Sequence, residues 1–458
     1  MPDKIIPTIT IEKLVYGGSG LAHDENGKAI FVPATLPKET VRVKVIREKK
    51  DYAEGYAEEI LVPSPERRQP ECPVFGICGG CQIQHLSESG QASHKNEVLS
   101  GFMRQIKQTD PFSIDPIVTS PLPFHYRLRG QFVLQKGQIG FYRRESHTLV
   151  PIDQCPLMVP AINHAISFFN AKGIDLLTKA YKGAVLPNNY DLEIQGTEAG
   201  EVLFVLRDPG NSSFSEEKMT AFFEQARMAG GTHFSLQGGI VYSQKMEASL
   251  AGHGAPARGA SPARRFQWGQ DFLTYPLSGG KMRVRDRTFV QVNLAMLEPL
   301  RKGVMAWADD KNARWLEIHA GAGFFTLPLS ETAASVVSIE ANPISVQDAE
   351  WNLAAAGRKN VQMIASLGGN AMARFPAQSF THLLLDPPRS GMTDMELAEI
   401  VRIAPRKILY LSCHPATLIR DIKRFSDSGY RVRRVLPFDL FPQTGHLEVL
   451  VELGGGII

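Results

Sequence analysis

The chain has 458 residues, of which 43% are apolar and 21% are charged, and its formal net charge is +3. This composition is typical of a globular protein with two to four domains of about 100–200 residues each, and it excludes a disordered or polyelectrolyte chain. No run approaches the roughly 18–20 continuous apolar residues that a membrane span needs, and the N-terminus lacks the basic-then-apolar pattern of a secretion signal. We therefore expect a cytoplasmic protein without membrane contact.

Residues 1–62 contain short runs of alternating apolar residues separated by glycine-rich turns. This pattern favours a small β-barrel. Nine Lys or Arg residues stand against ten Asp or Glu residues here, so the segment is not basic overall. A local basic stripe is either a phosphate-facing surface for RNA or a solvated strand face. Its members are Arg42, Lys44, Arg47, Lys49 and Lys50.

Four of the five cysteines form one pattern. Cys72, Cys78 and Cys81 have the spacing C-x5-C-x2-C, and Cys155 follows 74 residues later, before a proline. Clustered cysteines in a cytosolic protein more often bind metal or do chemistry than form disulfides. Four thiolates can hold zinc or a 4Fe–4S cluster, and one triplet with a remote fourth ligand favours the cluster over zinc or reduced structural thiols.

The stretch from residue 63 to residue 280 mixes helical and strand patterns, which predicts a central α+β domain that carries the cysteine site. We expect an amphipathic helix within residues 86–110 and strands within 124–206, around 126–134 and 139–142. Residues 252–265 are rich in Gly, Ala, Pro and Arg and predict an exposed loop or linker. A second candidate RNA-facing group consists of Arg127, Arg129, Arg143 and Arg144.

From residue 281 onward, strand-like runs alternate with helical segments. This alternation predicts a doubly wound, mostly parallel sheet. The expected strands lie at residues 314–319, 336–340, 381–386, 408–411 and 449–451.

Several polar or glycine residues follow these strands, at the edge where open α/β sheets bind ligands. Gly321 and Gly323 form a G-x-G turn, and Glu340 ends the next strand, where its carboxylate can accept hydrogen bonds from ribose hydroxyls. This pattern fits NAD or S-adenosylmethionine. Asp386, in Asp-Pro-Pro, and Cys413, at a later strand exit, favour S-adenosylmethionine, and Cys413 there is either a nucleophile or a packed thiol.

Taken together, these motifs resemble the bacterial RNA 5-methyluridine methyltransferases, and residues 1–62 resemble a TRAM domain, an OB-like RNA-binding module. The resemblance covers nearly the whole chain. The matching stretches are 289–293 (FVQVN), 321–329 (GAGFFTLPL), 385–391 (LDPPRSG), 411–418 (LSCHPATL) and 439–448 (DLFPQTGHLE).

The resemblance implies transfer of a methyl group from S-adenosylmethionine to C5 of a uridine in RNA. It implies that Cys413 is the nucleophile that adds to C6, and that Glu448 is the general base for the C5 proton. It assigns the cofactor site to Gln291, His319, Gly321, Glu340 and Asp386, and a 4Fe–4S cluster to the four cysteines. The TRAM-like start favours 23S rRNA over tRNA, and we expect a monomer.

The chain departs from the usual family pattern at some cofactor contacts. His319 occupies an aromatic position, Phe324 stands where many relatives have Asn, and residues 365–369 lack the Asp or Asn expected at the adenine. Two other functions remain open. One is an exocyclic-amine nucleic-acid methyltransferase, suggested by Asp386-Pro387-Pro388 but without the aromatic that should follow; the other is a non-catalytic RNA-binding iron–sulfur protein.

These expectations give a three-part chain. Residues 1–62 are expected to form the barrel, 63–280 the central domain with the cysteine site, and 281–458 the methyltransferase domain.

Overall fold

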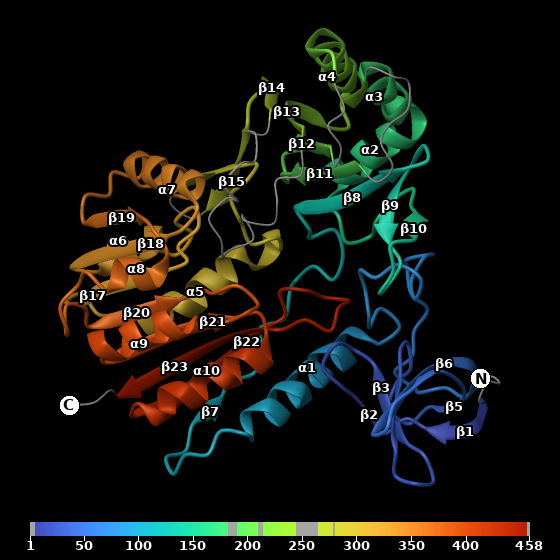
Figure 1. Cartoon of the computed structure of the whole chain (residues 1–458), viewed down its shortest axis with the longest axis horizontal. Coiled ribbons are helices and arrows are strands. Elements are labelled where there is room, and N and C mark those ends of the chain that lie inside the picture. The colour runs from blue at the N-terminus through green and yellow to red at the C-terminus, as the bar shows by residue number, and fades with distance from the viewer. Residues whose placement is uncertain (1–4, 182–189, 209–213, 244–263, 278–279, 456–458) are drawn as a thin grey trace.

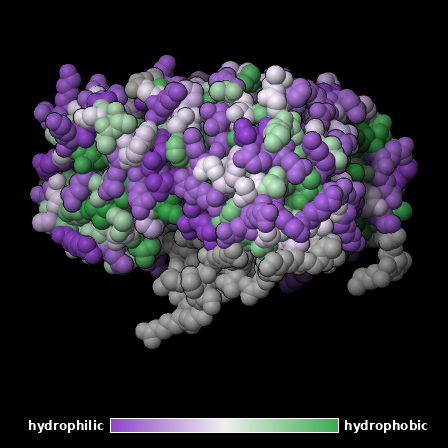
Figure 2. Space-filling model, turned by 90° about the horizontal axis from the view of Figure 1, so that it is seen from above, coloured by the Kyte–Doolittle hydropathy of each residue, from purple (hydrophilic) through white to green (hydrophobic). Residues whose placement is uncertain are grey.

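The computed structural model describes residues 5–181, 190–208, 214–243, 264–277 and 280–455 (Figure 1). Most of the expected loop at 252–265 lies outside these residues. On the face seen in Figure 2, hydrophilic side chains predominate and hydrophobic ones lie in small groups. No helix in the described ranges is long and apolar enough to cross a bilayer.

The N-terminal segment forms a six-stranded sheet in the order β1-β5-β6-β4-β3-β2. Buried and less buried residues alternate along β4 and the first half of β5, as the sequence pattern predicts. The buried set, which includes Ile11, Ile30, Val41 and Val43, forms a separate small core. The strands are β1 (Ile5–Thr10), β2 (Lys13–Leu14), β3 (Gly20–His23), β4 (Ala29–Val32), β5 (Thr40–Glu48) and β6 (Tyr52–Val62).

The expected helix within 86–110 is α1 (Glu88–Met103), which begins at Ser87, whose hydroxyl accepts a hydrogen bond from the Gly90 N–H. It packs beside α10 (Pro415–Asp427) of the C-terminal segment (Figure 1). Its buried face includes Gln91 and Lys95 as well as Leu99, so it is more polar than an ordinary core face. The following strand, β7 (Ser113–Ile114), pairs with the C-terminal sheet.

The rest of the central segment forms a seven-stranded sheet, ordered β10-β9-β8-β11-β12-β13-β14, and a hairpin, β15 and β16. The strands are β8 (Arg129–Gln135), β9 (Gln138–Tyr142), β10 (Leu149–Pro151), β11 (Tyr190–Gly196), β12 (Glu201–Asp208), β13 (Ser235–Ser243), β14 (Arg264–Gly269), β15 (Phe272–Leu277) and β16 (Gly280–Arg285).

Helices in the central segment correct one expectation. Residues 160–180, which fell inside a stretch expected to be strands, are helical because their apolar side chains recur with helical spacing and pack on the sheet. The elements are α2 (Pro160–Phe168), the π-helical turn η1 (Phe169–Gly173), α3 (Ile174–Ala180) and, later, α4 (Glu216–Gly230).

The C-terminal segment is an eight-stranded sheet in the order β19-β18-β17-β20-β21-β23-β22-β7. Strands β17 to β21 are parallel, and β23 runs antiparallel between β21 and β22, which confirms the predicted doubly wound, mostly parallel sheet. The strands are β17 (Arg314–Ile318), β18 (Ser335–Glu340), β19 (Val361–Ala365), β20 (His382–Leu385), β21 (Lys407–Ser412), β22 (Tyr430–Phe438) and β23 (Glu448–Gly455).

Both faces of this sheet are buried. Leu384, Leu409 and Leu411 face one core, whereas Leu383 and Ile408 face the other, so alternate residues of each strand contact different layers. Besides α10, the helices are η3 (Leu294–Met296), α5 (Leu297–Ala308), α6 (Thr326–Thr332), α7 (Pro343–Ala355), α8 (Gly368–Met372) and α9 (Asp394–Ile403).

Candidate active site

The carboxyl ends of β17 and β18 form the first part of the site. After β17 the chain turns through His319, Gly321 and Gly323, which all have positive φ angles. The Glu340 carboxylate, at the end of β18, accepts hydrogen bonds from the Gly321 N–H (2.9 Å) and from the Asn342 N–H (2.8 Å). A Cβ at Gly321 would meet no atom closer than 3.9 Å, so one side of this turn is open.

His319 lies between two carboxylates. Its Nε2 is 3.3 Å from Glu396 Oε1, without hydrogen-bond geometry. Burial opposes ionisation of Glu396, but His319 and Thr393 outweigh it and lower the pKa of that carboxyl to about 2. Asp386, which follows β20, is partly buried, and this burial with the negative charge of Glu340 raises its pKa to about 7, while His319 opposes the shift.

Cys413 and Glu448 come from neighbouring antiparallel strands. Ser412 of β21 is opposite Val449 of β23, and continuing this register by one residue brings Cys413 opposite Glu448. Burial, Glu448 and Asp386 raise the pKa of the Cys413 thiol to about 12, and Arg389 opposes them. Burial also raises the pKa of Glu448 well above its usual range. Glu448 is 2% exposed and its Oε1 has no hydrogen-bond partner in the described structure.

Two features beside Cys413 favour the thiolate. Pro415 begins α10 two residues later, so Cys413 lies at the positive end of a 13-residue helix dipole. His414 caps this helix, because its Nδ1 accepts a hydrogen bond from the Thr417 N–H at 3.4 Å. The guanidinium of Arg389 supplies a positive charge near Cys413, and its Nη2 is 3.4 Å from His446 Nε2.

The loop between β22 and β23 carries His446 and leads into Glu448. Lys95 of α1 is buried and donates to Asp439 Oδ1 (2.6 Å) and to the Phe441 carbonyl (3.0 Å). Gln443 exchanges two hydrogen bonds of 2.9 Å with Gln91. These contacts explain the polar buried face of α1, which fixes the loop that positions Glu448.

A cavity of about 700 Å³ extends from this edge to the cysteines. All four cysteines of the pattern line it, together with Arg389 and His446. Burial raises the pKa of the Cys155 thiol to about 11, and Cys72 and Cys78 add to the shift. All five cysteines are free thiols. Within the described ranges, however, no group of three or more His, Cys, Asp or Glu side chains is arranged to hold a metal ion.

Gln291 and Phe289 belong to the segment that joins the central core to the C-terminal sheet. Gln291 is 7% exposed, whereas Phe289 is 61% exposed and lines the cavity. The Leu128 N–H donates to the Val292 carbonyl at 2.9 Å, so this segment is fixed to the central domain.

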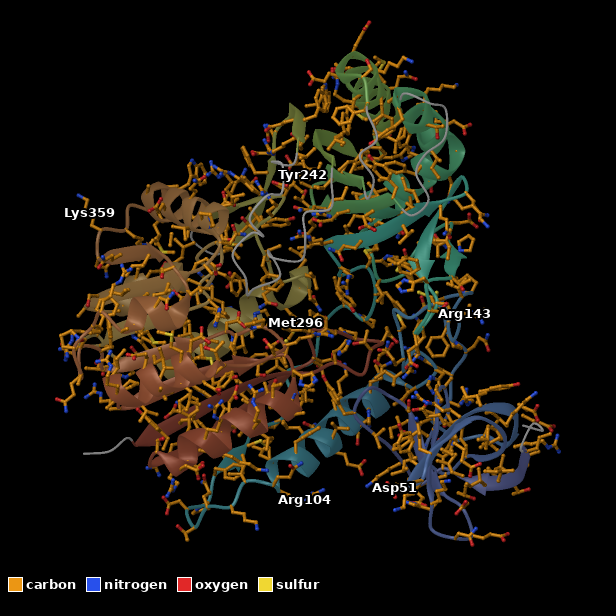
Figure 3. The ribbon with its side chains drawn as sticks, in the orientation of Figure 1. Asp51, Arg104, Arg143, Tyr242, Met296 and Lys359 are labelled. Carbon is orange, nitrogen blue, oxygen red and sulfur yellow. The ribbon has the colours of Figure 1, made fainter. Side chains whose placement is uncertain are left out.

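The two basic groups have mixed surroundings. In the first stripe, Arg42 pairs with Glu59 and Arg47 lies 3.7 Å from Glu54, so its charge is partly neutralised. In the second, Arg129 is bound to Glu193 and faces inward, whereas Arg143 is exposed beside β9, on the side of the seven-stranded sheet nearest the N-terminal sheet (Figure 3). Contact of either group with RNA stays a prediction.

The structure therefore brings the predicted catalytic pair together with Asp386, and Gly321 with Glu340, at one sheet edge. Sequence reasoning assigned no role to Arg389 or His446, although both lie inside the quoted motifs. Lys95 and Gln91 were also missed, because a polar face on a helix carries no signal of the distant loop it binds.

The chain is similar in sequence to known RNA methyltransferases. The profile of the family tRNA (Uracil-5-)-methyltransferase matches residues 258–454, and the TRAM domain matches residues 7–57. An uncharacterized RNA methyltransferase of Aquifex aeolicus is 32% identical over 99% of both chains. The 23S rRNA (uracil(1939)-C(5))-methyltransferase RlmD of Klebsiella pneumoniae is 30% identical, over 97% of this chain and 95% of that protein.

Among solved structures, the tRNA (uracil-54, C5)-methyltransferase of Pyrococcus abyssi has the same fold, with a TM-score of 0.73 and 21% identity over 98% of this chain and 99% of that one. The chain therefore belongs to the RNA uracil-5-methyltransferase family and is an enzyme of that family with an N-terminal TRAM domain.

Proposed function

We propose that this enzyme uses S-adenosylmethionine to methylate C5 of a uridine in RNA, through a covalent bond between Cys413 and C6 of the base. The observation that carries the proposal is the register of β21 and β23, which brings a thiol opposite a buried carboxylate with an unpartnered oxygen. The general base must accept a proton from C5, and Glu448 Oε1 is suited to this because it has no hydrogen-bond partner in the described structure.

The proposed reaction has three steps. The Cys413 thiolate adds to C6, and the electron pair of the C5–C6 double bond moves toward O4 to give an enolate. C5 of the enolate then takes the methyl group, and the bond from that group to the sulfonium sulfur breaks. Finally the Glu448 carboxylate removes the C5 proton, the C5–C6 double bond re-forms, and Cys413 leaves as the thiolate.

The charges around Cys413 fit this sequence. The high pKa keeps the thiol protonated when only protein groups surround it. The helix end at Pro415 and the Arg389 guanidinium stabilise the thiolate, and a cationic methyl donor nearby adds to their effect. The thiolate is thus favoured once both substrates are bound, which protects it from side reactions.

The residues at the ends of β17 and β18 suit the cofactor. Each Glu340 oxygen accepts one backbone N–H and has capacity for a second donor, so it can bind ribose hydroxyls. The open side of the turn at Gly321 allows close approach of a ligand. We assign Gln291, His319 and Asp386 to the same site. The solved relative from Pyrococcus abyssi was crystallised with S-adenosyl-L-homocysteine, which supports this choice of cofactor.

We propose 23S rRNA as the substrate, acted on by a cytoplasmic monomer. Support comes from relatives named for 23S rRNA that match almost the full chain. The test is methylation of 23S rRNA fragments and tRNA transcripts, with 5-methyluridine located by mass spectrometry, alongside mapping in a strain that lacks the gene. Methylation of tRNA alone would overturn the choice of RNA. Retained activity in Cys413→Ala would overturn the covalent route and favour methylation of an exocyclic amine.

We also propose that Cys72, Cys78, Cys81 and Cys155 hold a 4Fe–4S cluster. The support is that all four thiols line one cavity and influence one another's ionisation, although their side chains do not already form a metal-binding arrangement. A cluster there would fix residues 72–81 to the loop between β10 and α2 that carries Cys155. Anaerobic purification should give about four iron atoms per chain and a brown chromophore. Protein without iron, or with zinc in its place, would refute the assignment.

A further inference from the structure

The turn at residues 15–18 connects β2 to β3 of the N-terminal sheet. It is closed by a 2.9 Å hydrogen bond from the Gly18 N–H to the Val15 carbonyl. Gly17 and Gly18 have φ angles of 91° and 80°, which other residues rarely adopt. This tight turn presents Tyr16 at its tip, and the turn contacts both loops that carry the proposed catalytic residues.

The first contact is with the loop of the nucleophile. The Tyr16 ring meets the His414 ring edge to face, with 5.4 Å between centroids and an interplanar angle of 89°. It also meets the Phe102 ring of α1 edge to face, with 5.9 Å between centroids and an interplanar angle of 89°. Because His414 follows Cys413 and caps α10, this packing restrains the backbone on which the thiol is carried.

The second contact is with the loop of the general base. A Cβ on Gly445 would lie 2.8 Å from the Gly17 carbonyl carbon and 2.9 Å from the Gly18 nitrogen, so the two backbones touch. Gly445 is three residues before Glu448. One turn of the N-terminal sheet thus contacts the His414 side chain in one catalytic loop and the backbone of the other. In agreement, burial raises the pKa of the Tyr16 hydroxyl, the charges of Cys413 and Glu448 raise it further, and Arg389 opposes the shift.

We propose that Tyr16 is a positioning residue for the methyl transfer: its ring holds His414, and through it Cys413, in the geometry that attacks the uracil ring. The N-terminal sheet then contributes to the rate of the chemical step as well as to any binding of RNA. This inference rests on the proposed role of Cys413. It assigns the effect to the ring of Tyr16, not to its hydroxyl.

The experiment measures the rate constant for covalent adduct formation on an RNA that contains 5-fluorouridine, by rapid quench at saturating RNA and S-adenosylmethionine. Tyr16→Ala should react at least about tenfold more slowly, because small misplacements of a reacting group cost rate strongly. Tyr16→Phe keeps the ring and should stay within about twofold of the wild-type rate. Tyr16→Leu keeps most of the side-chain volume but loses the aromatic contact, so it should react as slowly as Tyr16→Ala. This variant tests the contact even if Tyr16→Ala folds poorly.

The matched control is Tyr56→Ala, which removes a 44% exposed tyrosine from β6 of the same sheet and should leave this rate constant unchanged. A double-mutant cycle with His414→Ala tests the route: the two effects should be non-additive. Tyr16→Ala that reacts at the wild-type rate, with only the Kd for RNA changed, would overturn the proposal, as would Tyr16→Phe as slow as Tyr16→Ala or fully additive effects. Absence of any adduct with the wild-type enzyme would instead refute the proposed function.

Discussion

Replacement of Glu448 by Gln separates the two halves of the proposed reaction. The amide has nearly the same shape as the carboxyl, so the buried position can be filled without a cavity. It cannot take the C5 proton. Loss of a general base costs about 10²–10⁴ in rate, or about 3–5 kcal/mol of transition-state stabilisation. We therefore expect multiple turnover of Glu448→Gln to fall by that factor.

Attack by Cys413 should survive in the same variant. Glu448 is the larger of the two neighbouring charges that raise the pKa of the Cys413 thiol, so its removal lowers that pKa and makes the thiolate easier to form. Cys413 should add to C6, and C5 of the base should receive the methyl group. The reaction should then stop, because no base removes the C5 proton. Methylated RNA should remain covalently bound to the protein.

The assay follows methyl-labelled cofactor into a protein–RNA band on a denaturing gel, with natural uridine in the RNA. The control is Glu452→Gln on the same strand, where the carboxylate pairs with Arg434 and should not affect turnover. The double variant Cys413→Ala/Glu448→Gln should give no band. Turnover of Glu448→Gln at the wild-type rate, or loss of turnover without an accumulated adduct, would refute the reasoning.

Four further substitutions test other parts of the structure. Burial raises the pKa of Glu317 to about 7, which should cost the wild-type protein about 3 kcal/mol of stability as pH rises from 4.5 to 7. Over that range Glu317→Gln should therefore lose about 3 kcal/mol less than the wild type, as urea unfolding at several pH values will show, and equal pH profiles would contradict this. Lys95→Met leaves Asp439 buried without its partner and should cost about 3–5 kcal/mol, whereas a melting temperature like that of the wild type would mean that the ion pair is dispensable. Glu340→Gln should weaken S-adenosylmethionine binding by about 1–3 kcal/mol in calorimetry, and unchanged affinity would remove Glu340 from the ribose site. Cys81→Ser should abolish iron incorporation under anaerobic conditions, and full iron content would exclude that ligand.

The sequence motifs were enough to predict the sheet and its site edge, because parallel strands buried on both faces read as short apolar runs. The chain after each run then had to lie at the carboxyl edge, which is why Glu340, Asp386 and Cys413 come together as expected. The family resemblance added Glu448. Its register opposite Cys413 could not be read from spacing alone, since it depends on β23 running antiparallel between β21 and β22.

Contacts between distant segments escaped prediction for a physical reason. Lys95 and Gln91 are hydrophilic residues on a helix, and a solvent-exposed position was the default expectation. They are buried because the loop at residues 439–446 supplies partners for their polar atoms. Tyr16 likewise looked like one residue of a glycine-rich turn, and only the packing of that turn on His414 and Gly445 points to its positioning role.

The central claim is that one thiol becomes bonded to the substrate base. The direct measurement is to react the wild-type enzyme with S-adenosylmethionine and 5-fluorouridine-containing RNA, digest both polymers, and sequence the modified peptide by mass spectrometry. The account predicts a methylated fluorouridine attached to Cys413. Attachment to another residue, or full methylation of ordinary RNA by an enzyme that never forms an adduct, would contradict it.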